Sequence, residues 1–176
     1  MKILCPIDFS KHSTNYFTYA LNLSKVLDAE LHVLHAYELD DSLVEKYVGN
    51  IEIKTQCKIK MDKLISAVIS SHSAHNIPFC VCKNGKSLEV IRVYSEESNI
   101  DLIIMGSQGR RSISNRVFGS TAKSVIDKLD IPVLVIPYTY VYQNLPSKLL
   151  LALDNKEIKN DIGFKVLSKI LNGLSQ

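Results

Sequence analysis

The stretch MGSQGRRSISNRVFGST, at residues 105–121, holds residue types that can bind an anion. Three of the seven glycines of the chain lie in it, at positions 106, 109 and 119, together with three arginines, five hydroxyl residues and no acidic residue. Glycine lets the backbone approach a ligand closely and adopt positive φ angles without a steric penalty. The unpaired amides and the dipole of a helix that begins at Gly119-Ser120-Thr121 would attract negative charge. The pattern indicates a phosphate-binding loop, and a flexible loop with a glycine-assisted helix start is the alternative.

The spacing of these glycines excludes two common phosphate loops. No Gly-Lys-Ser or Gly-Lys-Thr follows four residues after a glycine, as a Walker A loop requires, and the dinucleotide pattern G-x-G-x-x-G is absent. Asp8 lies shortly after another apolar run, Ile3-Leu4-Cys5. Ligands of open parallel sheets bind beyond the carboxyl ends of the strands, so Asp8 and the glycine stretch are expected at one edge.

Short apolar runs alternate with longer segments of helical period along the chain. The pattern predicts helices over 42–75, 87–98 and 120–129, and an earlier one on the stripe Phe17, Ala20, Ser24 and Leu27. Gly49 and Asn50 are expected to interrupt the early part of the second helix. Strands are expected at Ile3–Cys5, Leu31–Ala36, Pro78–Cys82, Leu102–Met105 and Val133–Ile136. Such alternation predicts an α/β fold, a doubly wound five-stranded parallel sheet with helices on both faces.

The overall composition is that of an ordinary globular protein. Of the 176 residues, 46% are hydrophobic and 22% are charged, with a formal net charge of +3. No run approaches the roughly 18 apolar residues that cross a bilayer, and MKILCPIDFS does not resemble a signal peptide. The four cysteines show no disulfide-framework spacing, and no basic stripe with interleaved aromatics suggests nucleic-acid binding. A soluble, cytoplasmic protein is expected.

The glycine spacing and its flanking sequence resemble a known family. Gly106-x2-Gly109-x9-Gly119-Ser120, with DLIIMG before it and IPVLVIP after it, is similar to the ATP-binding branch of the universal stress protein family. ILCPIDFS resembles the first strand and acidic residue of that family, LHVLHAYE its second strand, and NGKSLEVI its third helix. The resemblance covers residues 1–137. It implies a Rossmann-like domain that binds ATP, with or without Mg²⁺, and serves as a nucleotide-dependent stress-response module.

The resemblance also implies where ATP would bind in this chain. It places the adenosine end near Asp8, with the backbone of Ala36 bonding to adenine and Arg110 either screening phosphate charge or pointing into solvent. The full set of implied ligand-contacting residues is Pro6, Ile7, Asp8, Ala36, Met105, Gly106, Gly109, Arg110, Gly119, Ser120 and Thr121. A homodimer through the strand Val133–Ile136 is implied as well.

The pattern changes after Pro137. Residues 138–147 are expected to be a linker or an edge segment. KLLLALDNKEI at 148–158 echoes KILCPIDFSKH at 2–12, and a helical pattern follows both. Such self-similarity predicts that 148–176 is a partial second repeat, consisting of a first strand and helix, and chance similarity is the alternative. Because one β-α unit cannot form its own core, the 148–172 unit is expected to pack on this domain or to exchange between chains.

Catalytic and metal chemistry are weakly indicated. No catalytic residue is predicted, because Asp8 would lie far from the γ-phosphate; a weak ATPase, or an autophosphorylating enzyme using Ser112 or Ser114, is the alternative. His72, His75, Cys80 and Cys82 include zinc-ligand types, but their spacing fits no common zinc module, so buried cysteines are favoured and no metal site is predicted. His12, His32 and His35 are expected to be structural or surface residues.

Overall fold

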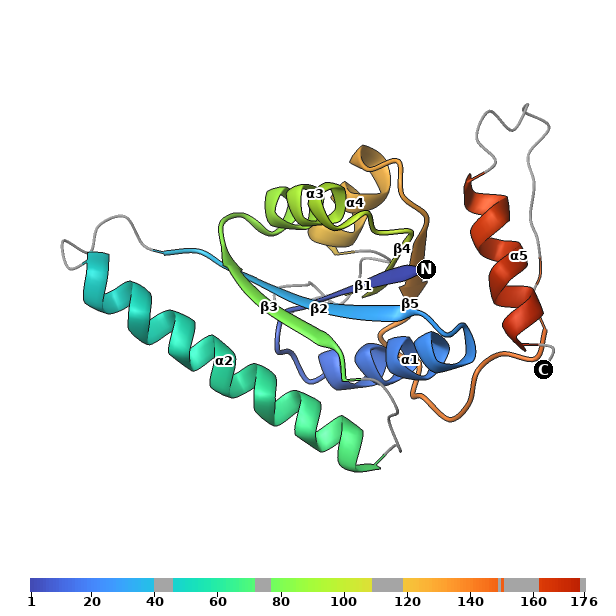
Figure 1. The fold of residues 1–176 in the computed structure, drawn as a ribbon, viewed down its shortest axis with the longest axis horizontal. Coiled ribbons are helices and arrows are strands. Elements are labelled where there is room, and N and C mark those ends of the chain that lie inside the picture. Colours follow the sequence, from blue (N-terminus) through green and yellow to red (C-terminus); the bar gives the residue numbers. More distant parts are fainter. Residues whose placement is uncertain (40–45, 72–76, 109–118, 149, 151–161, 175–176) are drawn as a thin grey trace.

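The computed structural model describes residues 1–39, 46–71, 77–108, 119–148, 150 and 162–174. Five strands form one sheet in the order β3-β2-β1-β4-β5, and every pair is parallel (Figure 1). Their bounds are β1 Lys2–Ile7, β2 Glu30–Tyr37, β3 Phe79–Asn84, β4 Leu102–Gly106 and β5 Val133–Ile136. The chain adds strands on one side of β1 and then on the other. The carboxyl ends of β1 and β4 are therefore the switch point of the strand order, the position at which such sheets bind ligands.

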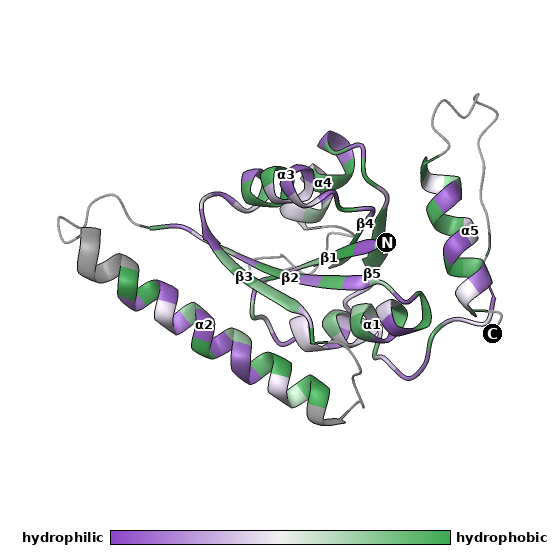
Figure 2. Ribbon diagram, viewed as in Figure 1, coloured by the Kyte–Doolittle hydropathy of each residue, from purple (hydrophilic) through white to green (hydrophobic). Residues whose placement is uncertain are grey.

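Helices cover both faces of this sheet, which confirms the predicted doubly wound fold. Figure 1 shows α1 (Ser13–Val26) and α2 (Lys46–Ser71) on one side, and α3 (Ser87–Ser98) and α4 (Ser120–Lys128) on the other. In Figure 2 the central strands are mostly apolar, whereas the helices carry polar residues along their outer sides. This distribution explains why strand runs were nearly continuous in hydrophobicity while the helices showed a stripe.

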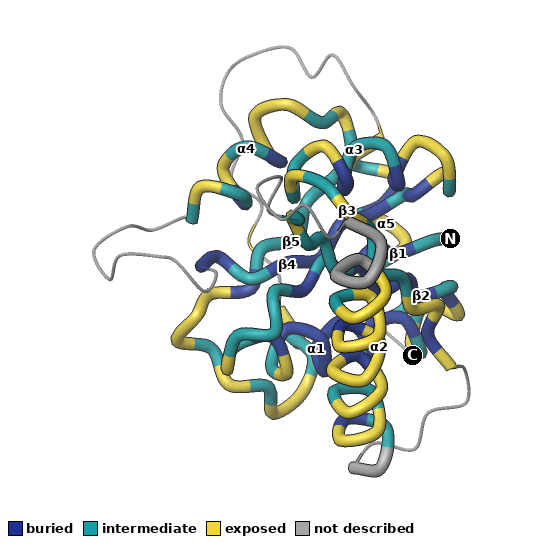
Figure 3. Tube along the Cα trace, turned by 90° about the vertical axis from the view of Figure 1, so that its left-hand side faces the viewer, coloured by how far each residue is buried: buried dark blue, intermediate teal, exposed yellow. Residues whose placement is uncertain are grey.

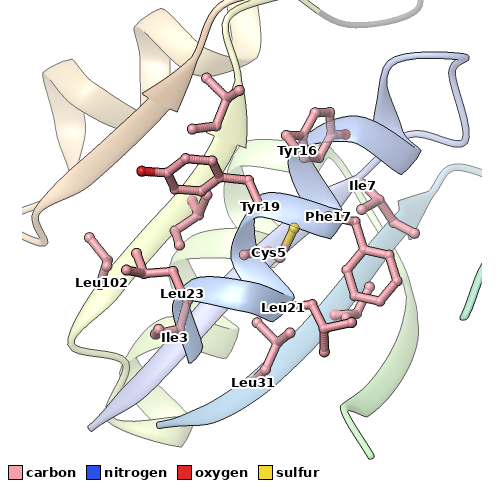
Figure 4. Close-up of a cluster of buried hydrophobic side chains, with 14 of the residues drawn as sticks. Ile3, Cys5, Ile7, Tyr16, Phe17, Tyr19, Leu21, Leu23, Leu31 and Leu102 are labelled. Carbon is pink, nitrogen blue, oxygen red and sulfur yellow. The ribbon is translucent and has the colours of Figure 1, made fainter. Parts of the chain in front are cut away.

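Two apolar clusters hold the layers together. Alternate residues of β1 point to opposite faces, so Ile3, Cys5 and Ile7 join the cluster under α1, whereas Leu4 joins the one under α3 and α4. Figure 4 shows the first cluster, in which Phe17 of α1 is completely buried against the sheet. Burial of one side chain of this size stabilises the fold by about 1.5–3 kcal/mol. The central strands β1 and β4 are thus fixed from both faces.

Most predicted elements have the expected positions, and one expectation was wrong. The bounds of α3 and β5 match the predicted ones, β1, β2 and β4 extend one or two residues further, and β3 begins one residue later and ends two residues later than predicted. Gly49 and Asn50 do not interrupt α2, because that helix runs without a break from Lys46 to Ser71. A glycine in a helix costs only about 1 kcal/mol relative to alanine, which a helix of this length can absorb.

The two edges of the sheet differ in how they are covered. Figure 3 shows that much of α2, which packs beside the edge strand β3, is exposed. Phe79 and Cys80 at the start of β3 are exposed as well. At the other edge, Val133, Leu134 and Val135 of β5 are only half-buried. Both edges therefore present apolar side chains to the surroundings.

Residues 138–145 run along α1. The side chain of Asn15 donates a hydrogen bond to the Tyr140 carbonyl and accepts one from the Tyr142 N–H at 2.6 Å. The ring of Tyr19 lies edge-on to those of Tyr140 and Tyr142. Further along the chain, α5 (Ile162–Leu174) lies against the last turn of α1, where Gly173 faces Leu27. The strand expected near 148–154 falls almost entirely outside the described residues.

Candidate functional site

Asp8 lies immediately beyond β1 and organises the loop that leads into α1. Its Oδ1 accepts hydrogen bonds from the Ser10 N–H at 3.0 Å and from the Ser13 hydroxyl at 2.8 Å. Ser13 is fully buried at the start of α1, and Asp8 itself is half-buried. Hydrogen bonds to a carboxylate are stronger than those between neutral groups. The carboxylate of Asp8 is therefore held in place by the loop that it organises.

Tyr16 connects this loop to the end of β4. Its hydroxyl lies 3.1 Å from the Ser13 Oγ, and its ring lies beneath Gly106. A Cβ at position 106 would come within 2.8 Å of that ring, which leaves no room for any side chain. Burial, followed by the Asp8 carboxylate, raises the pKa of Tyr16 well above its ordinary value. The phenol thus stays protonated and available for hydrogen bonding.

A positive φ was one of the two predicted reasons for glycine at position 106, and Gly106 does not have one. Among the described glycines, Gly85 is the one with a positive φ, at 136°. Gly106 is required instead by the close approach of the Tyr16 ring. The contact joins residues 90 positions apart in the chain, so no local pattern in the sequence indicates it.

Ser107 joins three segments at the carboxyl edge of the sheet. Its N–H donates to the Ile136 carbonyl at 2.8 Å, its carbonyl accepts from the Gly119 N–H at 2.6 Å, and its hydroxyl accepts from the Tyr138 N–H at 3.1 Å. The residue is 5% exposed. Sequence reasoning missed Ser107, although a small hydroxyl residue directly after a strand was visible. The hydrogen bonds fix the start of α4 beside the end of β4.

Gly119 is the N-cap of α4 and has an extended backbone, with φ −67° and ψ 159°. No side chain caps this helix, so its first amides are not paired in that way. Ser120 is exposed and Thr121 is half-buried in the first turn. Unpaired amides and the helix dipole make such an end a favourable position for an anion. The predicted residues Gly109 and Arg110 lie outside the described residues, as do Ser112 and Ser114.

The carboxyl ends of β1 and β2 meet at the place expected for a base. Ile7 pairs with His35, and the His35 Nδ1 donates to the Ile7 carbonyl at 2.8 Å. The rings of His35 and Phe9 are 4.3 Å apart between centroids, and Phe9 has an unusual φ of 54°. Ala36 follows at the end of β2 and is half-buried. Phe9 is a second residue that sequence reasoning did not include.

Met105 contributes to the core. Its side chain is 6% exposed and packs in the cluster between the sheet and α3 and α4. Any ligand contact from Met105 would therefore involve its backbone. Tyr16 thus links the Asp8 loop to Gly106 at the end of β4, and Ser107 links the end of β4 to Gly119 at the start of α4. Pro6 and Ile7 lie in β1, directly before Asp8.

Metal-binding clusters and membrane-spanning helices were searched for among the described residues. No group of three or more His, Cys, Asp or Glu residues among them is arranged to hold a metal ion. His72 and His75 lie outside the described residues, so a zinc site that includes them is not tested. His32 is buried in a structural arrangement, with its Nδ1 2.7 Å from the Tyr94 hydroxyl and its Nε2 beside Glu30. Within the same part of the chain, no helix has the length and apolar character needed to span a bilayer.

Residues 1–137 match the model of the universal stress protein family. The chain belongs to this family. Universal stress protein MJ0577 of Methanocaldococcus jannaschii is 38% identical over 155 residues, covering 77% of this chain and 93% of that protein. The match ends directly after β5, so residues 138–176 lie beyond the part of the chain that the family model describes.

Solved structures of family members show the same fold. Universal stress protein UspA from Lactobacillus plantarum superposes with a TM-score of 0.65 at 25% identity, over 77% of this chain and 97% of that one. A universal stress protein from Archaeoglobus fulgidus, solved in complex with dAMP, gives a TM-score of 0.53 at 18% identity, over 77% of this chain and 96% of the other. At this identity the second comparison describes the fold alone.

Proposed function

We propose that this universal stress protein binds an adenine nucleotide, ATP in particular, at the carboxyl edge of β1, β2 and β4, and acts as a nucleotide-dependent stress-response module. One observation carries the proposal. The Gly119 N–H donates to the Ser107 carbonyl at 2.6 Å, which holds the start of α4, uncapped by any side chain, at the edge where Asp8 lies. Dinucleotide- and nucleotide-binding sheets of this doubly wound kind bind their ligands at this same edge.

The two ends of the site suit the two ends of such a ligand. The Asp8 carboxylate can accept a hydrogen bond from a ribose hydroxyl, and the backbone of Ala36 can bond to adenine. At the other end, the first amides of α4 and the hydroxyls of Ser120 and Thr121 suit phosphate oxygens. Magnesium would be bound through the phosphates and water rather than by a full set of protein ligands. Hydrolysis and autophosphorylation are not part of this proposal.

Direct binding measurements test this function. Isothermal titration calorimetry of the purified protein with ATP, dAMP and GTP should give saturable binding of the two adenine nucleotides and much weaker binding of GTP. Denaturing the protein as purified and analysing the released small molecules by mass spectrometry should identify a bound adenine nucleotide. Absence of measurable ATP and dAMP binding, in a protein shown to be folded by circular dichroism, would refute the proposal.

A substitution of Asp8 tests whether its carboxylate contacts the nucleotide. Asp8→Asn keeps the size of the side chain and one hydrogen-bond acceptor for Ser13, while it removes the charge. It should weaken ATP binding about tenfold, which corresponds to the loss of one good hydrogen bond to a charged group. Glu38→Gln is the matched control, because Glu38 is an exposed carboxylate beyond the end of β2. Equal affinity of the Asp8→Asn variant and the control for ATP would exclude Asp8 from the site.

A further inference from the structure

Residues 138–142, which follow β5 and are called the strap below, contact both sides of the candidate site. The strap lies beyond residues 1–137, the part of the chain that matches the family model. The Tyr140 N–H donates to the Pro137 carbonyl at 3.0 Å, so the chain turns directly after β5. From this turn the strap passes alongside α1, the helix that follows the Asp8 loop (Figure 1). The turn therefore directs the chain from the end of β5 towards the loop that holds Asp8.

One end of the strap is attached to the phosphate side of the site. The Tyr138 N–H donates to the Ser107 hydroxyl at 3.1 Å. The carbonyl of the same buried serine accepts from the Gly119 N–H at 2.6 Å. A single residue therefore lies between the strap and the N-cap of α4, where we propose that the phosphates bind.

The other end of the strap is attached to the first turn of α1. The carboxamide of Asn15 donates to the Tyr140 carbonyl and accepts from the Tyr142 N–H at 2.6 Å. One donor and one acceptor on a single amide match the two backbone groups that an extended chain presents on one side. Asn15 lies two residues after Ser13, whose hydroxyl donates to Asp8 at 2.8 Å. The strap is thus connected to the Asp8 loop through the first turn of a helix.

Aromatic contacts support both attachments. The rings of His12 and Tyr138 are 6.2 Å apart between centroids and nearly perpendicular, at 82°. His12 is the last residue before α1 and belongs to the Asp8 loop. Further along the strap, the buried Tyr19 ring lies edge-on to Tyr140 at 6.0 Å and to Tyr142 at 6.2 Å. Edge-to-face pairs at such separations are attractive, so the strap is held against α1 by side chains as well as by its backbone.

We propose that the strap fixes the two sides of the nucleotide site relative to each other, with Asn15 as the positioning residue. This proposal rests on the nucleotide site proposed above, and it requires no contact between the strap and the ligand. A ligand binds more weakly when the binding-competent arrangement is populated for only part of the time. Because the strap joins Ser107 to the start of α1 by direct hydrogen bonds, it raises the population of that arrangement. ATP affinity should therefore depend on residues outside the family domain.

Amide hydrogen exchange of the ligand-free protein, followed by NMR, tests the strap without any nucleotide. Asn15→Ala removes both side-chain hydrogen bonds to the strap. The amides of Ser10 and Gly119, one on each side of the site, should exchange about tenfold faster than in the wild-type protein, while the amides of β2 keep their rates. The matched control is Asn22→Ala on the same helix, because the Asn22 side chain donates to the Thr18 carbonyl at 2.8 Å. Unchanged exchange of either amide in Asn15→Ala would overturn the proposal.

Calorimetry with ATP measures the consequence for the site. Asn15→Ala should bind ATP about fivefold more weakly than the wild-type protein, and Asn22→Ala should bind it equally well. Ser107→Ala breaks the same connection at its other end. The double variant of Asn15→Ala and Ser107→Ala should therefore lose less affinity than the product of the two separate losses. A full product would show that the two residues act independently, which contradicts a shared strap.

The two measurements separate this proposal from the proposed function. If the wild-type protein binds no ATP, the nucleotide function fails, while faster exchange of both amides in Asn15→Ala still supports the strap as the connection between the two loops. If the wild-type protein and Asn15→Ala bind ATP equally well, the nucleotide site stands and the positioning role is refuted. Tyr142→Pro removes the N–H that donates to Asn15 and leaves α1 unaltered. It should reproduce both effects, and it decides the matter if circular dichroism shows that Asn15→Ala does not fold.

Discussion

The hydroxyl of Ser107 accepts a hydrogen bond from the Tyr138 N–H at 3.1 Å. This bond joins the end of β4 to the first residues after β5, while the carbonyl of the same serine holds Gly119 at the start of α4. The two ends of the glycine stretch are therefore anchored by one buried residue. The segment that follows β5 therefore helps to fix the start of α4, where we propose that the phosphates bind.

Replacing this serine tests how much the anchor contributes. Ser107→Ala removes the acceptor for the Tyr138 N–H and leaves both backbone hydrogen bonds of residue 107 in place. We expect a loss of about 1 kcal/mol in the free energy of unfolding, measured by urea denaturation, because one buried hydrogen bond is lost. Ser107→Thr, which keeps the hydroxyl, should retain more of that stability than the alanine variant. Equal destabilisation by the two substitutions would show that the hydroxyl is not responsible.

Gly119→Val tests the phosphate end of the site. The backbone of Gly119 is extended, a conformation that valine adopts readily, so the fold should survive. The new side chain would cover the first amides of α4, and ATP binding measured by calorimetry should be abolished. Gly163→Val is the control, because a Cβ at Gly163 meets nothing within 4 Å. Unchanged ATP affinity in Gly119→Val would rule out the proposed phosphate seat.

Tyr16 should make stability depend on alkaline pH. Its pKa is raised in the folded protein, mainly by burial and next by the Asp8 carboxylate. The unfolded chain therefore releases this proton at lower pH than the folded one. The corresponding stability is fully present below about pH 10 and is lost as the pH rises above it. In Tyr16→Phe, the decline of unfolding free energy above pH 10 should be smaller by about 1.4 kcal/mol per pH unit.

Ser13→Ala is the matched variant for that measurement. It removes the hydroxyl that contacts Tyr16 but keeps the phenol, so it should lower stability at neutral pH without flattening the alkaline decline. Urea denaturation between pH 8 and 11 gives both quantities. If the free energy of unfolding of Tyr16→Phe fell with pH in parallel to that of the wild-type protein over this range, Tyr16 would not be the cause of the alkaline decline.

The exposed edge of β5 is the proposed dimer interface. The Ile103 N–H donates to the Pro132 carbonyl and the Ser107 N–H to the Ile136 carbonyl. In a parallel pair the bonds to one neighbour come from alternate residues, so the N–H of Val135 points away from β4. Val135→Pro should disrupt edge-to-edge pairing and give a monomer in light scattering coupled to size-exclusion chromatography. Val135→Ala keeps the N–H and should remain dimeric; a proline variant that also remains dimeric would place the interface elsewhere.

The local pattern of apolar residues was sufficient to predict most of the strands and helices. The apolar run Val133–Ile136 and the stripe of α3 were placed with correct bounds, because each depends on the period of its own residues. The predicted interruption of α2 at Gly49 was wrong, because the low helix propensity of glycine was considered without the contribution of the other residues of this long helix. Asp8 and Gly119 were proposed as site residues from their positions, Asp8 after a strand and Gly119 before a helix, and for both the structure confirms that position.

The remaining parts of the site depend on contacts between distant residues. The fit of Gly106 over Tyr16 and the role of Ser107 both join segments that the sequence does not show to be neighbours. The same holds for Asn15 and the backbone of Tyr140 and Tyr142. The left-handed backbone of Phe9 was also unexpected, because such a φ is rare in residues other than glycine, asparagine and aspartate.

The packing of Gly173 against Leu27 has a practical consequence. Since α1 runs back from the carboxyl to the amino side of the sheet, its last turn lies a full strand length from Asp8. A fluorophore or affinity handle joined after α5 would accordingly be remote from the proposed nucleotide, and could report on assembly without obstructing ligand entry.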